Sequence, residues 1–244
     1  MQYQRLFPLL TVLIFFACQP QKRVAVTDGP SDIRAQLVDS EGWTILFDGS
    51  NTDHWVELGK DKFPRNGWVI EDGALVLKKG GNIITREQYA DFELEFEFNL
   101  TEGANSGIKY YVAELTNEET GKTVMNGPEY QIIDDVYNPD IQKREDETVT
   151  TAALYLFYEP QGKQLKPAGE WNSGKIISRN GQVEHWLNGV KVVSYQRGGS
   201  DYLARKADTK FKDYKQYGEV KEGHIMLTDH NDKVYFRNIR VRKL

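Results

Sequence analysis

The sequence of 244 residues has almost no cysteine and no excess of basic residues. A single cysteine excludes a disulfide within the chain, a cysteine-rich zinc site and any redox chemistry that needs two thiols. Lysine and arginine number 31 against 36 acidic residues, for a formal net charge of −5, so the chain has no basic footprint for nucleic acid. Its length and its hydrophobic fraction of 39% suit one globular domain of all-β or α/β type, or two small ones.

Several motifs of common enzyme classes are also absent. The sequence has no G-x-S-x-G elbow, phosphate-binding loop, H-E-x-x-H zinc motif or dinucleotide glycine fingerprint. It also has no E-x-D-x-x-E strand, the pattern that places both carboxylates of a retaining β-glucanase on one strand. An ordinary glucanase with two carboxylates on one strand is therefore disfavoured.

The N-terminal hydrophobic run has the form of an export signal. Arg5 precedes an apolar stretch from Leu6 to Phe16, too short to span a bilayer comfortably, and a small residue then precedes Cys18. This resembles a bacterial lipoprotein signal, in which cleavage exposes the cysteine for acylation; an ordinary secretory signal with an incidental cysteine is the alternative. Gln19, where aspartate would retain a lipoprotein at the inner membrane, implies the outer membrane. We expect a signal over residues 1–18, a flexible tether over 19–40, and a lipid-anchored domain that faces the periplasm.

The rest of the chain, residues 41–244, shows short apolar alternations between turn signals. The clearest is Phe92–Phe98, with apolar residues on one face and glutamates on the other, which is typical of a half-buried antiparallel strand. Asp72-Gly73 and Asn188-Gly189 are typical of tight hairpins. Further strands are predicted at Trp43–Phe47, Trp68–Ile70, Ala74–Lys78, Gly107–Ala113, Glu129–Ile133, Ala152–Tyr158, Lys175–Ser178, Gln182–Leu187, Lys191–Tyr195, His224–Leu227 and Val234–Arg242.

These strands predict one all-β domain, a jelly-roll sandwich of two antiparallel sheets. Helical signal is confined to a candidate helix over Asp201–Lys215 and a possible single turn over Arg86–Tyr89. Polar and aromatic side chains on an outer, concave face of such a sandwich are available to a ligand. Tryptophan rings stack on sugars while carboxylates, amides and lysine address hydroxyls, so the composition favours a carbohydrate ligand.

Alternation assigns several polar side chains to faces. Glu129 and Gln131 share the face opposite Tyr130, and Lys109 shares a face with Tyr111. His185 alternates with apolar residues, so it is either a core histidine or a functional one, whereas Trp186 lies on the opposite face of its strand.

Other polar groups have simpler alternatives. The Glu93, Glu95 and Glu97 stripe suits a solvated strand face, and Trp171 and Trp186 suit core packing as well as sugar binding. The sequence Asp229-His230-Asn231-Asp232 suits a hairpin loop capped by its own side chains, although its residue types also bind metal.

An ordered series of segments carries a resemblance to a known family. They are GWTILFDGSNTDHW, GWVIEDGALVL, YADFELEFEFNL, GANSGIKYY, GPEYQIIDD, AALYLFY, PAGEWNSGKIISRNGQVEHWLNG and VYFRNIRVRKL. Together they resemble the 3-keto-disaccharide hydrolase domain, a family once catalogued as a domain of unknown function and common in Bacteroidetes lipoproteins. The resemblance covers Glu41 to Leu244 and implies a concanavalin A or laminin G-like jelly roll, with residues 198–222 as a variable insertion.

The resemblance implies action on glycosides already oxidised at carbon 3 of the sugar. A ketone at carbon 3 acidifies the hydrogen on carbon 2, so a base can remove that proton and the glycosidic oxygen can leave carbon 1 by β-elimination. Addition of water to the double bond completes a net hydrolysis. Such a site needs a base near carbon 2, an acid at the leaving oxygen and a group that stabilises the enolate.

The matched segments give the site hypotheses. Glu129 is expected as base or acid, His185 as a second proton-transfer group because imidazole titrates near neutral pH, and Lys109 as the enolate's counter-charge. The expected sugar contacts are Gln131, Asn105, Asp134, Trp171, Trp186 and His230. A divalent cation could polarise the ketone, but no ligand spacing demands one.

Three functions follow as alternatives. The first is a 3-keto-glycoside hydrolase or lyase that works with a sugar 3-oxidoreductase. The second is a non-catalytic carbohydrate-binding module, and the third is an ordinary glycosidase or polysaccharide lyase on the same fold.

Overall fold

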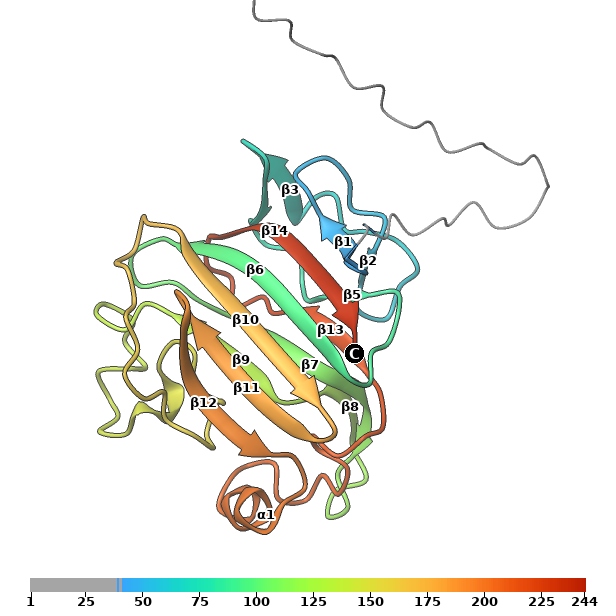
Figure 1. Ribbon diagram of the computed structural model, residues 1–244, viewed down its shortest axis with the longest axis vertical. Coiled ribbons are helices and arrows are strands. Elements are labelled where there is room, and N and C mark those ends of the chain that lie inside the picture. The colour runs from blue at the N-terminus through green and yellow to red at the C-terminus, as the bar shows by residue number, and fades with distance from the viewer. Residues whose placement is uncertain (1–38, 40) are drawn as a thin grey trace, which may run out of the picture. The chain divides into compact units, whose positions relative to one another are not determined.

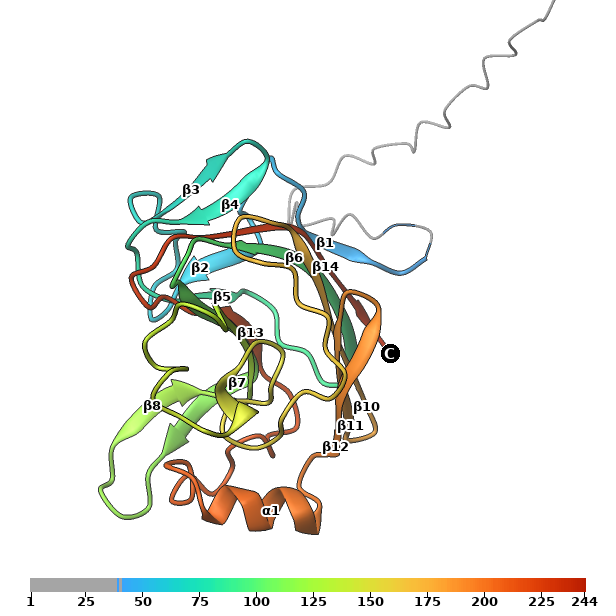
Figure 2. The same cartoon turned by 90° about the vertical axis from the view of Figure 1, so that its left-hand side faces the viewer.

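The computed structural model describes residue 39 and residues 41–244. The predicted signal, Cys18 and almost all of the predicted tether lie outside the described residues. Two antiparallel sheets pack face to face, which confirms the predicted all-β sandwich (Figures 1 and 2). No helix among the residues described is both long and apolar enough to cross a bilayer.

The larger sheet has eight strands. Seven of them follow the order β12-β11-β10-β6-β14-β4-β3. The eighth, β1, pairs with residues 239–241 of β14, whereas β4 pairs with residues 235–236. Its strands are β1 (Thr44–Phe47), β3 (Trp68–Glu71), β4 (Ala74–Leu77), β6 (Phe92–Leu100), β10 (Asn172–Arg179), β11 (Gln182–Leu187), β12 (Val190–Gln196) and β14 (Val234–Lys243). The smaller sheet has the order β2-β5-β13-β7-β8, with β9 also on β7. Its strands are β2 (Trp55–Glu57), β5 (Ile83–Thr85), β7 (Asn105–Thr116), β8 (Thr123–Asn126), β9 (Glu129–Ile133) and β13 (His224–Leu227).

Most predicted strands are present, and both predicted hairpin turns join adjacent strands. Asp72-Gly73 connects β3 to β4 and Asn188-Gly189 connects β11 to β12, all four residues having positive φ angles between 48° and 82°. Two consecutive positive φ angles give the type I′ turn whose twist matches the flanking strands. The pattern missed β2, β5 and β8, which have only three or four residues each.

Three local predictions were wrong. Residues 152–158 do not form a regular strand, because Ala152 and Leu156 have φ angles of 70° and 68° that break the extended backbone. The helix α1 spans only Ser200–Ala207, and the chain continues in turns. No helical turn forms over residues 86–89.

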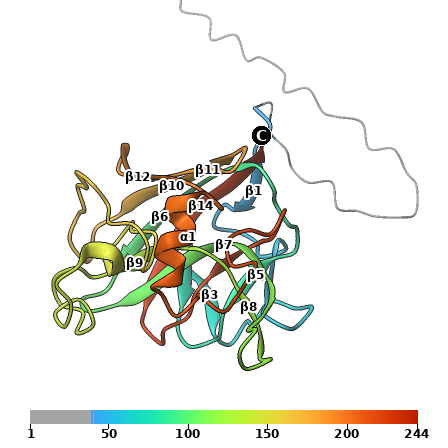
Figure 3. The ribbon, with the colours of Figure 1, turned by 90° about the horizontal axis from the view of Figure 1, so that it is seen from below.

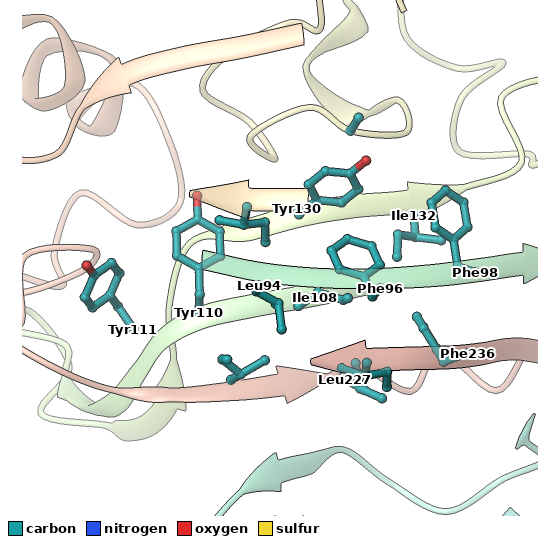
Figure 4. Packing of buried hydrophobic residues seen from close by; sticks show 14 of the residues in the cluster. Leu94, Phe96, Phe98, Ile108, Tyr110, Tyr111, Tyr130, Ile132, Leu227 and Phe236 are labelled. Atoms are coloured by element: carbon teal, nitrogen blue, oxygen red, sulfur yellow. The ribbon is translucent and has the colours of Figure 1, made fainter. Parts of the chain in front are cut away.

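The core lies between the sheets and is rich in aromatic residues. The inward residues of β6 pack on those of β7 and β9; for example, the Phe96 ring meets the Tyr130 ring edge-on, with centroids 5.3 Å apart (Figure 4). Tyr111 also points inward, contrary to the predicted alternation. Its φ angle of 51° marks a bulge, which turns two consecutive tyrosines, Tyr110 and Tyr111, toward the core.

The segment 198–222 closes one end of the sandwich, where α1 lies below β12 in Figure 2 and across both sheets when seen from below in Figure 3. A row of near-parallel aromatic rings joins this segment to the core. Its members are Tyr158, Tyr195, Tyr202, Phe157, Tyr217 and Phe211. Stacked rings of this size bury a large apolar area, so this segment is fixed to the sandwich rather than loosely attached.

Candidate active site

Glu129 and Gln131 project from β9 away from the core, on the outer face of the smaller sheet. Their neighbours Tyr130 and Ile132 are fully buried between the sheets, and side chains alternate along a strand. In the antiparallel register Lys109 of β7 lies directly opposite Glu129, so the two share the outer face. The structure therefore brings together Glu129, Gln131 and Lys109, whereas alternation predicted only that Glu129 and Gln131 share a face.

A missing side chain on β7 makes room for the Glu129 carboxylate. Gly107 lies opposite Gln131 on this face, and a Cβ at Gly107 would lie only 2.3 Å from Oε1 of Glu129. Any other residue at position 107 would collide with the carboxylate. Gly107 is not in the left-handed region, so its role here is space rather than backbone conformation.

The Glu129 carboxylate is buried but only loosely held. The residue is 5% exposed, yet its nearest polar partners are the Thr228 hydroxyl at 3.4 Å and the Lys109 ammonium at 3.7 Å. Charge-assisted hydrogen bonds are normally about 2.7–2.9 Å long. Lys109 is in turn positioned by the Asn126 side-chain oxygen at 2.9 Å. This carboxylate therefore has lone pairs free to accept a proton from a ligand.

Amide and carboxylate groups continue this face toward the β13–β14 loop. The Gln131 amide approaches the Asn105 side-chain oxygen at 3.4 Å, and the Asn105 backbone N–H donates to Asp232 at 2.9 Å. His230 is exposed in the same loop, which Asp229 fixes by accepting hydrogen bonds from the Gly80 and Gly81 N–H groups. His230 thus lies in the loop whose Asp232 holds Asn105, although no contact joins it to Glu129.

The Asp134 side chain is buried and stabilises a turn, so it does not face solvent. It is 5% exposed, and its carboxylate accepts hydrogen bonds from the backbone N–H groups of Gly103, Val136 and Tyr137 at 2.7, 2.9 and 3.3 Å. These bonds fix the turn after β9. Its acceptor capacity is largely used there, so the structure gives Asp134 a role in the turn instead of bringing it to the face that carries Glu129.

His185 lies in the core, which was the alternative reading of its alternation. It is fully buried between the sheets, with Nε2 2.8 Å from the Tyr110 hydroxyl and Nδ1 3.0 Å from the Ala152 carbonyl oxygen. Burial lowers the pKa of His185 from 6.5 to about 4, so the ring is neutral at pH 7. With both nitrogens engaged and no exposed surface, it does not reach the outer face that carries Glu129.

Trp186 lies on the other sheet and Trp171 lies beside it. Trp186 projects from the outer face of the larger sheet, and Trp171 lies just before β10 with the Arg237 guanidinium 4.0 Å from its ring centroid. A groove of about 640 Å³ lies there, with Trp186, Lys175 and Arg240 in its lining. The structure therefore does not bring Trp171 and Trp186 together with Glu129.

The glutamates along this face of the larger sheet are already paired. Each glutamate of the β6 stripe meets an arginine of β14: Glu93 with Arg242 at 2.5 Å, Glu95 with Arg240 at 2.6 Å, and Glu97 with Arg237 at 2.7 Å. Lys175 adds a second cation on Glu93 and Glu95. The stripe is an ion-pair ladder rather than a simple solvated face. Its carboxylates, unlike that of Glu129, have short contacts to cations, so we place the candidate active site at Glu129.

The arrangement around Glu129 can remove and return a proton and can stabilise a nearby negative charge. The carboxylate supplies the base, the Lys109 ammonium supplies a point charge, and the Gln131 and Asn105 amides supply hydrogen bonds. Within residues 39 and 41–244, no three carboxylate, imidazole or thiol groups gather as a potential metal site.

Three residues of this face were missed by the sequence prediction. Thr228, just after β13, contacts Glu129, and Asn126 of β8 contacts Lys109, a proximity that only tertiary structure reveals. Tyr155 is paired with Glu129 across the edge of β9, where the Tyr155 N–H donates to the Glu129 carbonyl oxygen at 3.0 Å. The one sequence feature that pointed to Tyr155 is that it lies in AALYLFY, one of the segments that carry the family resemblance.

Comparison with known proteins agrees with the fold and gives the family. The family described as the 3-keto-alpha-glucoside-1,2-lyase-like domain matches residues 42–242. A 3-keto-disaccharide hydrolase of Bacteroides thetaiotaomicron is 34% identical over 233 residues, which cover 85% of this chain and 80% of the relative.

Two crystal structures from Parabacteroides distasonis, each described as a "putative glycosyl hydrolase", are also similar. One is 33% identical with a TM-score of 0.73, covering 84% of this chain and 94% of that one. The other is 26% identical with a TM-score of 0.62, covering 83% and 99%.

Proposed function

Since this chain belongs to the family of 3-keto-α-glucoside-1,2-lyase-like domains, we propose that it cleaves the glycosidic bond of sugars already oxidised at carbon 3. The reaction is a β-elimination, which water can follow to give net hydrolysis. The proposal depends on one observation: the Glu129 carboxylate is buried, has no short contact to a cation, and occupies the space left by the missing side chain of Gly107.

The residues of the site suit the first step of this reaction. Glu129 takes the proton from carbon 2, and the electron pair moves into the bond between carbons 2 and 3, which leaves negative charge on the ketone oxygen. Lys109, held by Asn126, supplies a cation on the same face for that oxygen. Gln131 and Asn105 offer hydrogen bonds to the sugar hydroxyls. One carboxylate is enough, because elimination needs no opposed carboxylate pair.

The substrate's chemistry implies a partner reaction. A ketone at carbon 3 arises by oxidation of a secondary alcohol, so a sugar 3-oxidoreductase must supply the substrate. We propose that both activities operate outside the cytoplasm, with this domain held at the outer membrane by acylated Cys18 and facing the periplasm.

A glutamine variant tests the role of Glu129. Glu129→Gln keeps the shape but removes the base, so turnover of a 3-keto-glucoside should fall about 10²- to 10⁴-fold. Glu184→Gln is the matched control, because Glu184 lies on the outer face of the other sheet, bound to Lys191 at 3.0 Å. Near-wild-type release of the aglycone by Glu129→Gln would sink the assignment.

One assay separates this function from the two alternatives. The purified domain is incubated with a glucoside and with its 3-oxo derivative, and the products are followed by mass spectrometry. Cleavage of the oxidised sugar alone supports the proposal, and cleavage of both indicates an ordinary glycosidase. Binding without cleavage indicates a carbohydrate-binding module, for which the groove beside Trp186 is the specific candidate surface.

A further inference from the structure

The site as described holds a base but no acid for the leaving oxygen. His185 is enclosed in the core, and the Lys109 ammonium is bound to Asn126 and faces Glu129. The departing glycosidic oxygen is a poor leaving group unless it is protonated as it leaves. A second proton-transfer group is therefore expected on the same face.

The pairing beside β9 places Tyr155 on that face. Leu154 forms a bridge with Tyr130, and both are buried in the core. Residues directly opposite each other in antiparallel pairing share a face, so the next pair places Tyr155 beside Glu129, where the partly buried Tyr155 ring also packs against the core before the chain turns at Leu156. The Tyr155 N–H donates to the Glu129 carbonyl oxygen at 3.0 Å, which fixes this register.

The phenol of Tyr155 lies next to a cation. Tyr155 is half-buried, its hydroxyl is 3.5 Å from the Lys210 ammonium, and the same ammonium lies 4.9 Å from the ring centroid. Lys210 itself is exposed and belongs to the segment 198–222. An ammonium at this distance can stabilise the negative charge that develops on a phenol oxygen as it donates its proton to a leaving group.

We propose that Tyr155 is the general acid that protonates the leaving oxygen, a role that rests on the proposed function. After Glu129 has taken the proton from carbon 2, the enolate electron pair re-forms the ketone. The double bond then forms between carbons 1 and 2, the bond from carbon 1 to the glycosidic oxygen breaks, and that oxygen takes the Tyr155 proton. The Lys210 ammonium stabilises the phenolate left behind.

The same two groups can complete the cycle. The Tyr155 phenolate takes a proton from a water molecule as its oxygen adds to carbon 1, and protonated Glu129 returns its proton to carbon 2. Both residues then regain their starting states, with a water molecule consumed and a free 3-keto sugar formed. Elimination without hydration would instead require the solvent to reset both groups.

Leaving-group dependence tests the proposal. Tyr155→Phe is assayed on a 3-keto disaccharide, whose sugar leaving group needs protonation, and on a 3-keto 4-nitrophenyl glucoside, whose leaving group does not. We expect kcat to fall about 10²- to 10⁴-fold on the disaccharide and only a few-fold on the nitrophenyl substrate. Tyr158→Phe is the matched control, because that hydroxyl binds Asp201 at 2.7 Å instead of facing Lys210.

A second variant gives an independent readout on an exposed residue. Lys210→Met removes the cation beside the phenolate left after proton transfer, so kcat should fall about tenfold on the disaccharide and stay within about twofold of wild type on the nitrophenyl substrate. Equal losses on both substrates with Tyr155→Phe, or an unchanged kcat on the disaccharide with Lys210→Met, would overturn the role of Tyr155. A wild-type protein that cleaves neither 3-keto substrate would instead refute the proposed function itself.

Discussion

Replacing Gly107 with alanine should separate the position of the Glu129 carboxylate from the stability of the fold. The added methyl group would lie 2.3 Å from Oε1 and 3.0 Å from both Cδ and Cγ of Glu129. Ordinary contacts between such atoms are about 3.5 Å, so the carboxylate must move by roughly 1 Å. It can move, because it is the far end of a flexible side chain held only by contacts of 3.4 and 3.7 Å.

The expected effect is large on activity and small on folding. A catalytic group displaced by about 1 Å can lose about 10² in rate, which corresponds to about 2.7 kcal/mol of transition-state stabilisation. The backbone of Gly107 is not in the left-handed region, so alanine imposes no strain there. Loss of glycine's freedom in the unfolded chain should leave the free energy of unfolding unchanged or raise it by up to about 1 kcal/mol.

The measurement is kcat/KM on a 3-keto-glucoside beside a thermal unfolding curve. Gly174→Ala is the matched control, because its Cβ would lie 2.2 Å from the ring of Phe96 in the core, where no flexible chain end can yield. That variant should lose about 1–3 kcal/mol of stability. Wild-type activity in Gly107→Ala would refute the claim that catalysis depends on the position of the Glu129 carboxylate beside Gly107.

Three further predictions concern residues away from Glu129. The pKa of His185 is about 4 in the folded chain and 6.5 in the unfolded chain, so between these values the unfolded chain binds one more proton. The free energy of unfolding should therefore fall by about 3 kcal/mol from pH 7 to pH 4. Denaturant titrations of His185→Gln should lack that part of the decline. Trp186→Ala should keep kcat and KM on a small 3-keto-glucoside, because Trp186 lies on the other sheet, and a tenfold rise in KM would place that ring in the substrate site. Cys18→Ala should move the full chain from the detergent phase to the aqueous phase in detergent partitioning, whereas unchanged partitioning would indicate an anchor other than acylated cysteine.

The strands were predictable where alternation is long or where a turn residue fixes the hairpin. Phe92–Phe98 and Asn188-Gly189 are examples, because a half-buried strand and a type I′ turn each impose their own residue pattern. The segment from Ala152 to Tyr158 misled the prediction, because its apolar residues suit a strand while positive φ angles at two positions bend it. Nothing in those residue types signals a left-handed backbone.

The site was predictable only on β7 and β9. Glu129 and Gln131 stand out because Tyr130 and Ile132 define the buried face between them. Tyr155 did not stand out, since its neighbours are apolar on both sides and no face can be read. His185 fitted both the core and the site, and only the tertiary hydrogen bonds of its two nitrogens decide between them.

The segment 198–222 leaves and rejoins the sandwich at nearly one point. Arg197 donates to the carbonyl oxygens of Gly218 and Val220, while its guanidinium lies 3.8 Å from the ring centroid of Tyr111 in the core. A loop closed at its base in this way can vary in its exposed part without altering the strand register, as long as the buried rings of Tyr202, Phe211 and Tyr217 stay in place. Changing the exposed part of this loop would replace Lys210 and its neighbours and leave Glu129 in place. The fold thus gives protein engineers one point of attachment at which the surroundings of Tyr155 can be changed while the strands stay as they are.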